Sequence, residues 1–595
     1  MKKQGAFQIW RSRRDGSTHE QLSHNPANVR DFVWSLDGTR IYFSVEDQTR
    51  EALQRAEQEE GRRGFLLDER FVAGQQQSRP VLVGNDHSDR QSDAWGNESD
   101  IWVRDISRQS ERRATASDLE LLARIRDRKK LQYKRLARTS SSPIPSSIAI
   151  SENQQNLAWA DVARPGEKAA YPEFKIFAAS GQAGGIPVAC TAEPCTGRIQ
   201  GIWWSEDDKE IVFDRAEGIN HASHALYAWS FPTEHVRRIL YTNDMLRGCS
   251  MAGPRLICLH ESPTTPRRIV SVSLDDGILA PVVDPNPEFC NIRFGQVERL
   301  EWTNEFGHAA FGHFLKPLDY KTGEKYPLVV LTYRSLGFLR GGVGDEYPAH
   351  VLAANGFAVL SFDKPDPSEY LPPAQDVVES MRALDRDFIG YRSTLASLEK
   401  GISLVESSGL IIPERIGLTG LSYGAETVMF SLLYGQTKYA AAIVSSTSWD
   451  PIGFYVTDDA SRSELTKIGR GLPEGPSADW WRKISPALNV DKIHTPILMN
   501  VADGELVLSM QTISTLKAYQ KPLEVFVYPD EQHVKGWPSH RYAIYERNLD
   551  WFTFWLKGEE DPAPSKTAQY ARWRGLRALI DDSAFKSKSA NPTTH

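Results

Sequence analysis

The sequence is poor in cysteine and has no long apolar run. Only five of its 595 residues are cysteine, and none stands in a C-x-x-C pair, which argues against a zinc site. No segment approaches the ~20 consecutive apolar residues that cross a bilayer. Neither sign of charge dominates, because 70 Lys and Arg oppose 77 Asp and Glu, for a net charge of -7. We therefore expect no metal site, no membrane span and no nucleic-acid partner.

What is present is ordinary for globular domains. Hydrophobic residues make up 40% and charged residues 25% of the chain, which excludes wholesale disorder. A chain of this length divides into roughly two to four domains. The first residues, MKKQGAFQIWRSRRDG, are basic but lack the apolar stretch of a signal peptide.

Residues 1–300 contain repeated β-structure. In segments such as 32–45 and 202–214, two strands that alternate apolar and polar residues flank an acidic or glycine-containing turn. Repetition of this kind is typical of a β-propeller, and roughly five or six blades of about 40–50 residues would fit the length. A plain β-sandwich is the alternative, although it rarely runs so long. Two charged helical insertions interrupt the pattern, at about 46–63 and 117–138.

Four of the cysteines stand where hairpins are expected. Cys249 and Cys258 lie symmetrically about a Gly-Pro turn signal, so in a hairpin they would face each other within disulfide range. Cys190 and Cys195 flank the residues T-A-E-P in the same manner. The alternative is that all five thiols are buried and reduced. Disulfide bonds at these pairs would imply an oxidising compartment.

Near residue 300 the pattern changes, and buried strands begin to alternate with helices. This order predicts a parallel sheet covered by helices, an α/β domain over about 301–560. A C-terminal helical extension is expected over 561–595. The expected strands include 327–333, 357–363 and 416–420, and the expected helices are about 347–355, 368–407 and 425–435.

The strongest local signal is the segment G-L-S-Y-G at 420–424, which lies between a predicted strand and a predicted helix. This is the context of a nucleophile elbow, in which glycines relieve crowding and the serine hydroxyl projects above the carboxyl edge of the sheet. The motif alone is frequent by chance, and it is the placement that makes Ser422 the predicted nucleophile.

A nucleophilic serine needs a base and an orienting carboxylate, which follow it in the order Asp, His in this context. Asp503 ends one predicted strand and His533 follows the next, so both would lie at carboxyl ends of strands, where open α/β sheets bind ligands. Glu505 is the alternative carboxylate. Two neighbours are predicted to be bystanders, His540 as a surface or packing histidine and Asp530 as a turn cap.

An oxyanion that forms during acyl transfer needs hydrogen-bond donors fixed in advance. One predicted donor is the backbone N–H of Tyr423, directly after the serine. The other is the hydroxyl of Tyr333, at the start of the loop after the strand 327–333. Alternatively, Tyr333 only ends a core strand. The glycines of this loop do not follow the phosphate-loop pattern, and we expect no cofactor.

These motifs resemble the prolyl oligopeptidase family of serine peptidases, in which a β-propeller precedes an α/β-hydrolase domain. The resemblance covers nearly the whole chain and is most specific in GLSYG, VADGE and YPDEQH. Within that family the chain is similar to the lasso peptide isopeptidases, in segments at 59–71, 284–289 and 333–348. It implies an open-sided propeller, the triad Ser422, Asp503 and His533, and Tyr333 as oxyanion donor.

The resemblance also implies a reaction, hydrolysis of the isopeptide bond that joins the N-terminal amine of a lasso peptide to an Asp or Glu side chain. The alternatives are a dipeptidyl or acylaminoacyl peptidase of the same family and, from another class, an inactive propeller scaffold. Glu59 and Glu60 superficially match the glutamates with which dipeptidyl peptidases hold a substrate amine, although a solvated helix end is the simpler interpretation. Family members usually carry roughly a further blade upstream. We expect a bacterial protein, periplasmic if the cysteines pair and otherwise cytoplasmic.

Overall fold

The structure is a computed structural model, and several segments of the chain lie outside the residues that it describes. Tyr333, Asp530 and residues 50–99 are among those outside. In parts of some elements, 46–49, 127–136 and 581–589 among them, only the backbone is described. The described residues are 7–12, 19–49, 100–136, 147–153, 155–163, 172–180, 185–332, 334–339, 349–372, 374, 376–446, 449–457, 459–529, 531 and 533–589.

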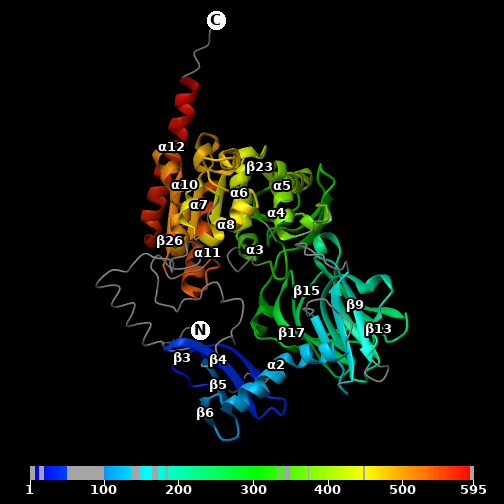
Figure 1. Ribbon diagram of the computed structural model, residues 1–595. Coiled ribbons are helices and arrows are strands. Elements are labelled where there is room, and N and C mark those ends of the chain that lie inside the picture. The colour runs from blue at the N-terminus through cyan, green and yellow to red at the C-terminus, as the bar shows by residue number, and fades with distance from the viewer. Residues whose placement is uncertain are drawn as a thin grey trace.

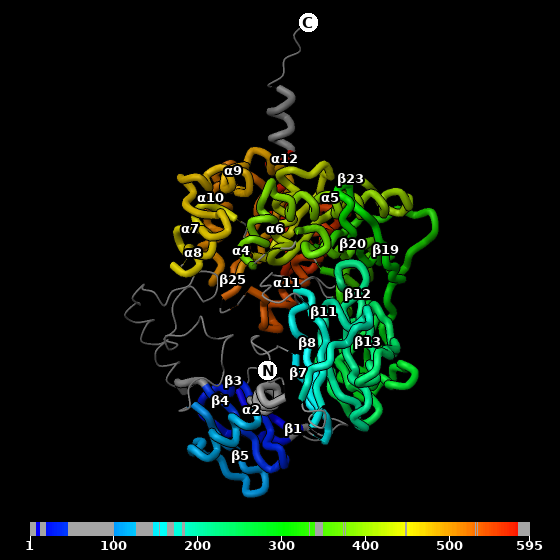
Figure 2. Tube along the Cα trace, turned by 45° about the vertical axis from the view of Figure 1, so that its right-hand side comes forward, coloured from blue at the N-terminus to red at the C-terminus, as the bar shows by residue number. Residues whose placement is uncertain are grey.

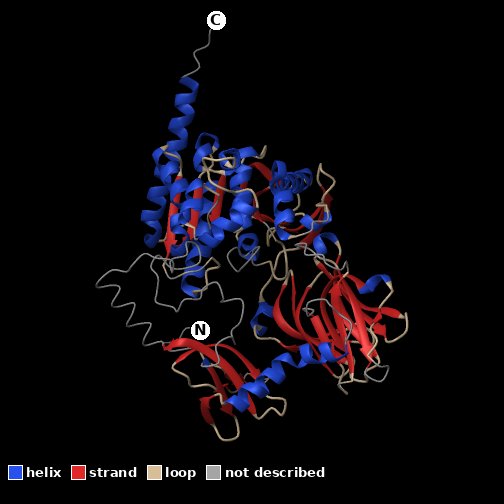
Figure 3. Cartoon of the chain, viewed as in Figure 1, coloured by secondary structure: helices blue, strands red, loops and turns tan. Residues whose placement is uncertain are grey.

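Antiparallel sheets make up the N-terminal half of the chain, which Figure 3 shows as the strand-rich lower part of the molecule. Within the described residues, four four-stranded units follow one another after the β1–β2 pair, and a short β9–β11 pairing joins two of them. The strands are β1 (Trp10–Ser12), β2 (His19–Gln21), β3 (Ala27–Trp34), β4 (Arg40–Thr49), β5 (Ile101–Asp105), β6 (Ser110–Arg113), β7 (Ser147–Ile150), β8 (Asn156–Val162), β9 (Phe174–Ser180), β10 (Val188–Ala189), β11 (Thr196–Trp204), β12 (Glu210–Glu217), β13 (Ser223–Ser230), β14 (Val236–Thr242), β15 (Met245–Ala252), β16 (Arg255–Ser262), β17 (Thr265–Ser273) and β18 (Leu279–Val283).

The β3–β6 sheet lies apart from the sheets of β7–β18, and helix α2 (Ala116–Leu136) runs between them (Figures 1 and 2). This helix occupies the basic insertion expected at 117–138, and its Leu122 is buried against Tyr42 and Val103 of the β3–β6 sheet. The other expected insertion, 46–63, begins differently, because β4 continues to Thr49 in antiparallel pairing with β3. The remainder of that insertion lies outside the described residues.

Two disulfides close short segments of these sheets. Cys249 and Cys258 are joined across the β15–β16 hairpin, with their Cα atoms 4.2 Å apart. Cys190 and Cys195 are joined across the turn between β10 and β11, with a Cα separation of 5.8 Å. Cys290 is an exposed free thiol.

The C-terminal half is a mixed eight-stranded sheet with helices on both faces (Figure 1). Strands β21 to β26 are parallel in the order β22-β21-β23-β24-β25-β26, and the β19–β20 hairpin adds an antiparallel edge. The strands are β19 (Val297–Thr303), β20 (Ala309–Leu315), β21 (Tyr326–Thr332), β22 (Ala358–Asp363), β23 (Ile411–Leu421), β24 (Ala441–Ser445), β25 (Ile497–Ala502) and β26 (Leu523–Tyr528). The helices are α3 (Ala349–Ala354), α4 (Val377–Asp385), α5 (Ile389–Ser407), α6 (Tyr423–Tyr434), α7 (Pro451–Val456), α8 (Asp459–Lys467), α9 (Ala478–Ile484), α10 (Leu506–Ala518), α11 (Pro538–Phe552) and α12 (Thr567–Ser589).

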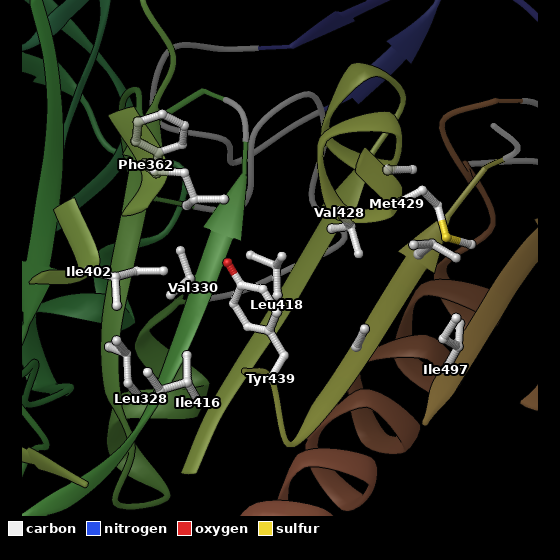
Figure 4. Close-up of a cluster of buried hydrophobic side chains, with 14 of the residues drawn as sticks. Leu328, Val330, Phe362, Ile402, Ile416, Leu418, Val428, Met429, Tyr439 and Ile497 are labelled. Atoms are coloured by element: carbon white, nitrogen blue, oxygen red, sulfur yellow. The ribbon is translucent and has the colours of Figure 1, made fainter. Parts of the chain in front are cut away.

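Both faces of this sheet are buried, as its nearly continuous apolar strands predict. Alternate residues of β21 show the division, since Leu328 and Val330 pack into the cluster of Figure 4. Val329 and Leu331 pack on the opposite face, into a cluster that includes Trp573 of α12. The C-terminal helix is therefore part of the core of the α/β domain.

One expected helix is wrong. Residues 368–407 do not form a single helix but two, α4 and α5, separated by a short 3-10 turn at Arg386–Phe388. The backbone of Asp387 and Phe388 is left-handed, with φ of 51° and 55°, which an α-helix cannot continue through. The helical pattern on both sides is real, but the chain turns between them.

Contacts between polar groups connect β11 and the turn after β12 to the C-terminal α/β domain. Arg198 of β11 pairs with Asp366 at 3.1 Å. The Asn220 amide donates to Asp363 at 3.0 Å, and Asp363 is fully buried at the end of β22. No helix among the described residues is long and apolar enough to cross a membrane.

Candidate active site

The G-L-S-Y-G segment forms a sharp turn between β23 and α6. Ser422 stands alone between the two elements, and its backbone adopts φ 60° and ψ -129°. A non-glycine residue rarely has a positive φ, and such strain costs of order 1–3 kcal/mol. The N–H groups of Ala425 and Glu426 donate to the Ser422 carbonyl at 2.8 and 3.1 Å, so α6 starts at once. The serine hydroxyl therefore stands at the carboxyl end of β23.

Crowding explains the two glycines of this turn. A Cβ on Gly420 would lie 2.4 Å from Thr332 Oγ1 and equally close to the carbonyl carbon of Gly424. A Cβ on Gly424 would lie 2.7 Å from the Thr332 carbonyl oxygen. Thr332 ends β21, and its hydroxyl donates to the Gly424 carbonyl at 3.1 Å. The turn thus packs directly on the neighbouring strand, and only glycine fits at either place.

His533 lies after β26, and its Nδ1 nitrogen is 2.5 Å from Glu505 Oε1. Glu505 is 4% exposed, whereas the His533 side chain is 40% exposed. Ser446, directly after β24, donates to the same carboxylate oxygen at 3.4 Å. A buried carboxylate on Nδ1 orients an imidazole, leaves Nε2 as the base and stabilises the imidazolium form.

Asp503, the carboxylate favoured by the sequence, stands at the other end of the same turn. Asp503 and Glu505 bound a 3-10 turn, Asp503–Glu505, in which about three residues make one revolution, so their side chains point about two-thirds of a turn apart. Asp503 Oδ1 accepts a hydrogen bond from the Gly504 N–H at 2.8 Å. It is Glu505 that lines the cavity shared by Ser422 and His533. The geometry therefore favours the alternative carboxylate.

This candidate catalytic cavity has a volume of about 650 Å³, in the range of ligand pockets. Part of its lining consists of apolar side chains of three helices and their ends: Val377, Val378, Met381, Leu465, Ile468 and Leu508. Three further carboxyl groups line it, those of Glu426, Asp450 and Glu464, and burial raises the pKa of the first two. Tyr391 donates to Glu426 at 2.6 Å. The cavity thus offers a mainly apolar surface next to Ser422.

A second cavity, of about 640 Å³, lies between strands β11–β13 and residues 368–374. Helix α4 contributes to both cavities, with Ser380 lining this one and Met381 the catalytic one. The second cavity is lined by several charged side chains, and two of its glutamates pair with Arg215, at 2.7 Å for Glu193 and 3.2 Å for Glu217. Helix α4 thus lines both a mainly apolar cavity and a charged one.

Of the two expected oxyanion donors, one can be placed. Tyr423 is the first residue of α6, where the helix dipole favours negative charge near the backbone N–H. Its ring stacks on Tyr391, with centroids 5.5 Å apart. Tyr333 lies outside the described residues. The residue before it, Thr332, pairs in register with Gly420, so the chain enters that loop beside the nucleophile turn.

His540 is engaged away from the catalytic cavity. Its Nδ1 is 2.8 Å from Glu531, a carboxylate that is 4% exposed. Glu531 also accepts from the N–H groups of Gly536 and Trp537, at 2.7 and 2.9 Å. His540 and Glu531 together close the loop that carries His533. Asp530 lies outside the described residues.

Sequence reasoning missed Ser446 and the apolar lining that α4 contributes. Nothing in the local sequence marks Ser446, because its contact with Glu505 depends on the pairing of β24 with β25. The apolar lining that α4 contributes depends on the direction of α4, which the helix break at 386–388 sets. A short-range pattern carries neither kind of information.

Comparison with known proteins gives the class of the protein. Residues 393–559 match the prolyl oligopeptidase family. Over 99% of its length the chain is 34% identical to the lasso peptide isopeptidase AtxE2 of Asticcacaulis excentricus, of which it covers 78%. The chain therefore belongs to the prolyl oligopeptidase family of serine peptidases, and the resemblance inferred from its motifs is confirmed.

Its similarity within that family is to a lasso peptide isopeptidase. A solved structure of AtxE2, a serine-to-alanine variant with Astexin3-dC4 bound, matches at a TM-score of 0.78 with 32% identity, covering 97% of this chain and 82% of that one. The predicted fold, a β-propeller followed by an α/β-hydrolase domain, is thereby confirmed.

More distant relatives match part of the sequence or the fold alone. Dipeptidyl-peptidase 5 of Porphyromonas endodontalis is 21% identical over 354 residues, which are 56% of this chain and 48% of that protein. An acylaminoacyl peptidase of Pyrococcus horikoshii has the same fold, at a TM-score of 0.56 and 16% identity, over 93% of this chain and 85% of that one.

Proposed function

We propose that the protein hydrolyses the isopeptide bond of a lasso peptide, with Ser422 as nucleophile, His533 as general base and Glu505 as the orienting carboxylate. In this proposal Glu505 takes the role predicted for Asp503. The observation that carries the proposal is that these three side chains line one cavity, with His533 bonded to Glu505. The match to a lasso peptide isopeptidase along nearly the whole chain supports the substrate class.

In the first step, Ser422 Oγ attacks the isopeptide carbonyl carbon while His533 Nε2 takes the hydroxyl proton. Glu505 balances the positive charge that the imidazole acquires. The carbonyl π electrons move onto oxygen and form a tetrahedral oxyanion. The Tyr423 backbone N–H is the proposed donor to this oxyanion, with the Tyr333 hydroxyl as the second.

The intermediate collapses when its C–N bond breaks and His533 gives the proton to the leaving N-terminal amine. The Asp or Glu side chain of the peptide stays bonded to Ser422 as an ester. Water then attacks this ester, His533 takes the proton of the water, and the proton returns to Ser422 Oγ as the ester bond breaks. The net change is one water added, which opens the ring and leaves a linear peptide with a free amine and a free carboxylate.

The second candidate is a dipeptidyl or acylaminoacyl peptidase. The partial match to dipeptidyl-peptidase 5 favours it, and the same triad would serve. This activity requires only a linear substrate, from whose N-terminus a short segment is cleaved. It predicts rapid turnover of chromogenic dipeptide amides and of acylated peptides, whereas an isopeptidase specific for the lasso form would leave them intact.

We propose a periplasmic location in a bacterium, which the two disulfides of the propeller support, because such bonds persist in oxidising compartments. The cytoplasm is the alternative, in which these four thiols would be reduced. Alkylation of free thiols in cell fractions distinguishes the two, since only Cys290 reacts without prior reduction if the bonds are formed.

The decisive experiment is mass spectrometry of peptides incubated with the protein. Threaded lasso peptides are expected to gain one water, and their unthreaded linear forms are expected not to change. Ser422→Ala should abolish the conversion. Ser431→Ala is the matched control, because this serine is buried in the same helix and donates to the Thr427 carbonyl at 2.8 Å. Cleavage of linear peptides with no action on threaded ones would refute the proposal.

A further inference from the structure

The loop that carries His533 also contains a lysine that the proposed reaction does not use. Lys535 follows His533 by two residues and is 1% exposed. Burial of an ammonium group is unfavourable unless hydrogen bonds compensate for the lost hydration. A lysine buried in a loop beside the proposed base is therefore expected to form hydrogen bonds that matter to the position of that loop.

The ammonium group connects the loop to the sheet. Lys535 Nζ donates to Ser445 Oγ at 2.9 Å and to the backbone carbonyl of His533 itself at 3.3 Å. Ser445 is the last residue of β24 and is fully buried. Its hydroxyl in turn donates to the Asn500 carbonyl of β25 at 3.3 Å. Lys535 thus anchors the main chain of His533 to two adjacent strands.

These contacts form a closed circuit with the proposed triad. Ser446, next to Ser445 in the chain, contacts Glu505 at 3.4 Å, and Glu505 contacts His533 at 2.5 Å. The path then returns through the His533 carbonyl to Lys535 and Ser445. Glu505 holds the Nδ1 nitrogen of the His533 ring, and Lys535 holds the His533 backbone carbonyl. Loss of the Glu505 contact or of the Lys535 contact would allow the imidazole ring to move.

We propose that Lys535 is a positioning residue for the hydrolysis, which holds the main chain of His533 against the end of β24 so that the imidazole stays aligned between Glu505 and Ser422. The inference rests on the proposed function in that it takes His533 as the base. The hydrogen bonds described for Lys535 go to Ser445 and to the His533 main chain, so its proposed effect comes through His533.

Three variants test this role. Lys535→Met keeps the length of the side chain and removes its charge and its hydrogen-bond donors. Lys535→Arg keeps the charge and the donors. Ser445→Ala removes the acceptor on β24. Lys566→Met is the matched control, because Lys566 lies between α11 and α12 and pairs with Asp550 and Asp561, each at 2.9 Å. The readouts are kcat and KM on a threaded peptide, the rate at which a serine-directed phosphonate labels Ser422, and the thermal midpoint.

A misplaced catalytic group can cost on the order of 100-fold in rate, so Lys535→Met is expected to lower kcat and the labelling rate about 30- to 100-fold, with KM within about threefold. Lys535→Arg is expected to recover about tenfold of this loss, and Ser445→Ala to lose about three- to tenfold. Lys566→Met is expected to lower the thermal midpoint while kcat stays within about twofold of wild type.

Each outcome decides the matter. A folded Lys535→Met protein with wild-type kcat would show that the lysine only stabilises the domain, and the proposal would be wrong. If Lys535→Met does not fold, Ser445→Ala decides, since an unchanged kcat in that variant would equally overturn the proposal. If the phosphonate labels Ser422 but no threaded peptide is cleaved, the substrate proposal fails and the labelling rates still test Lys535. If wild-type Ser422 is not labelled, the triad itself is wrong and this role falls with it.

Discussion

The choice between Glu505 and Asp503 as the carboxylate behind His533 can be decided by two isosteric substitutions. Glu505→Gln and Asp503→Asn each replace a carboxylate with an amide of nearly the same shape. The two residues bound one 3-10 turn, so both variants perturb the same segment of backbone. A difference in rate between them therefore reports which carboxylate serves the imidazole.

The expected magnitude follows from the geometry of the pair. Two unit charges about 4 Å apart attract by about 4 kcal/mol at an effective dielectric constant of about 20. The His533 side chain is 40% exposed, and water screens part of this attraction. A loss of about 3 kcal/mol remains, which corresponds to roughly 100-fold in kcat at about 1.4 kcal/mol for each factor of ten. Asp503→Asn is expected to stay within about threefold of wild type, because it leaves the Glu505 contact in place.

The assay is the initial rate of conversion of a threaded peptide, followed by the mass of the product, together with the labelling of Ser422 by a phosphonate. The labelling rate removes any contribution from peptide binding. Thermal midpoints of both variants show whether the fold is intact. The reasoning would be refuted if Asp503→Asn lost roughly 100-fold while Glu505→Gln kept most of the wild-type rate, since Asp503 would then be the orienting carboxylate despite the observed contact.

Two further predictions concern stability. Burial lowers the pKa of His313, on β20, to about 4 from its ordinary value of 6.5. The contribution of the neutral imidazole to folding stability is therefore fully present above pH 6.5 and is lost as the pH falls through 4. The total loss is about 3 kcal/mol. Urea unfolding at pH 7 and pH 4.5 should show a smaller loss in His313→Gln than in wild type, and equal losses would contradict the assignment. The Cys249–Cys258 bond, between residues nine apart in the chain, is expected to stabilise the propeller by about 2–3 kcal/mol, so the double serine variant should melt several degrees lower. Cys290→Ser, at an exposed free thiol, should not change the melting temperature, and an equal fall in both would show that thiol loss rather than the bond is responsible.

Much of the fold could be predicted from the sequence because its signals are local. The buried strand of β21 and the turn at Ser422 both follow from patterns a few residues long. The helix break between α4 and α5 could not be predicted, because the left-handed backbone of Asp387 and Phe388 is imposed by packing rather than by glycine or proline at those positions.

The site itself shows where local information ends. Ser422 follows from its own motif, and His533 from its place after a strand, but the carboxylate depends on which end of a three-residue turn faces the imidazole. Asp503 and Glu505 are separated by one glycine in the chain, and both have the right chemistry. Only the neighbouring strand distinguishes them, since Ser446 after β24 meets Glu505.

The four segments that form the site follow four strands that are adjacent in the sheet, β23, β24, β25 and β26. The sheet sets the spacing of these segments, because both of its faces are buried in a closely packed core that resists deformation. Each side chain must then reach from its own loop to the shared site. A longer carboxylate placed one step later in the turn can therefore serve as well as a shorter one directly after the strand. The same reasoning gives Lys535 its importance, because His533 lies in a loop and needs a contact to the rigid strands that its own sequence position does not supply.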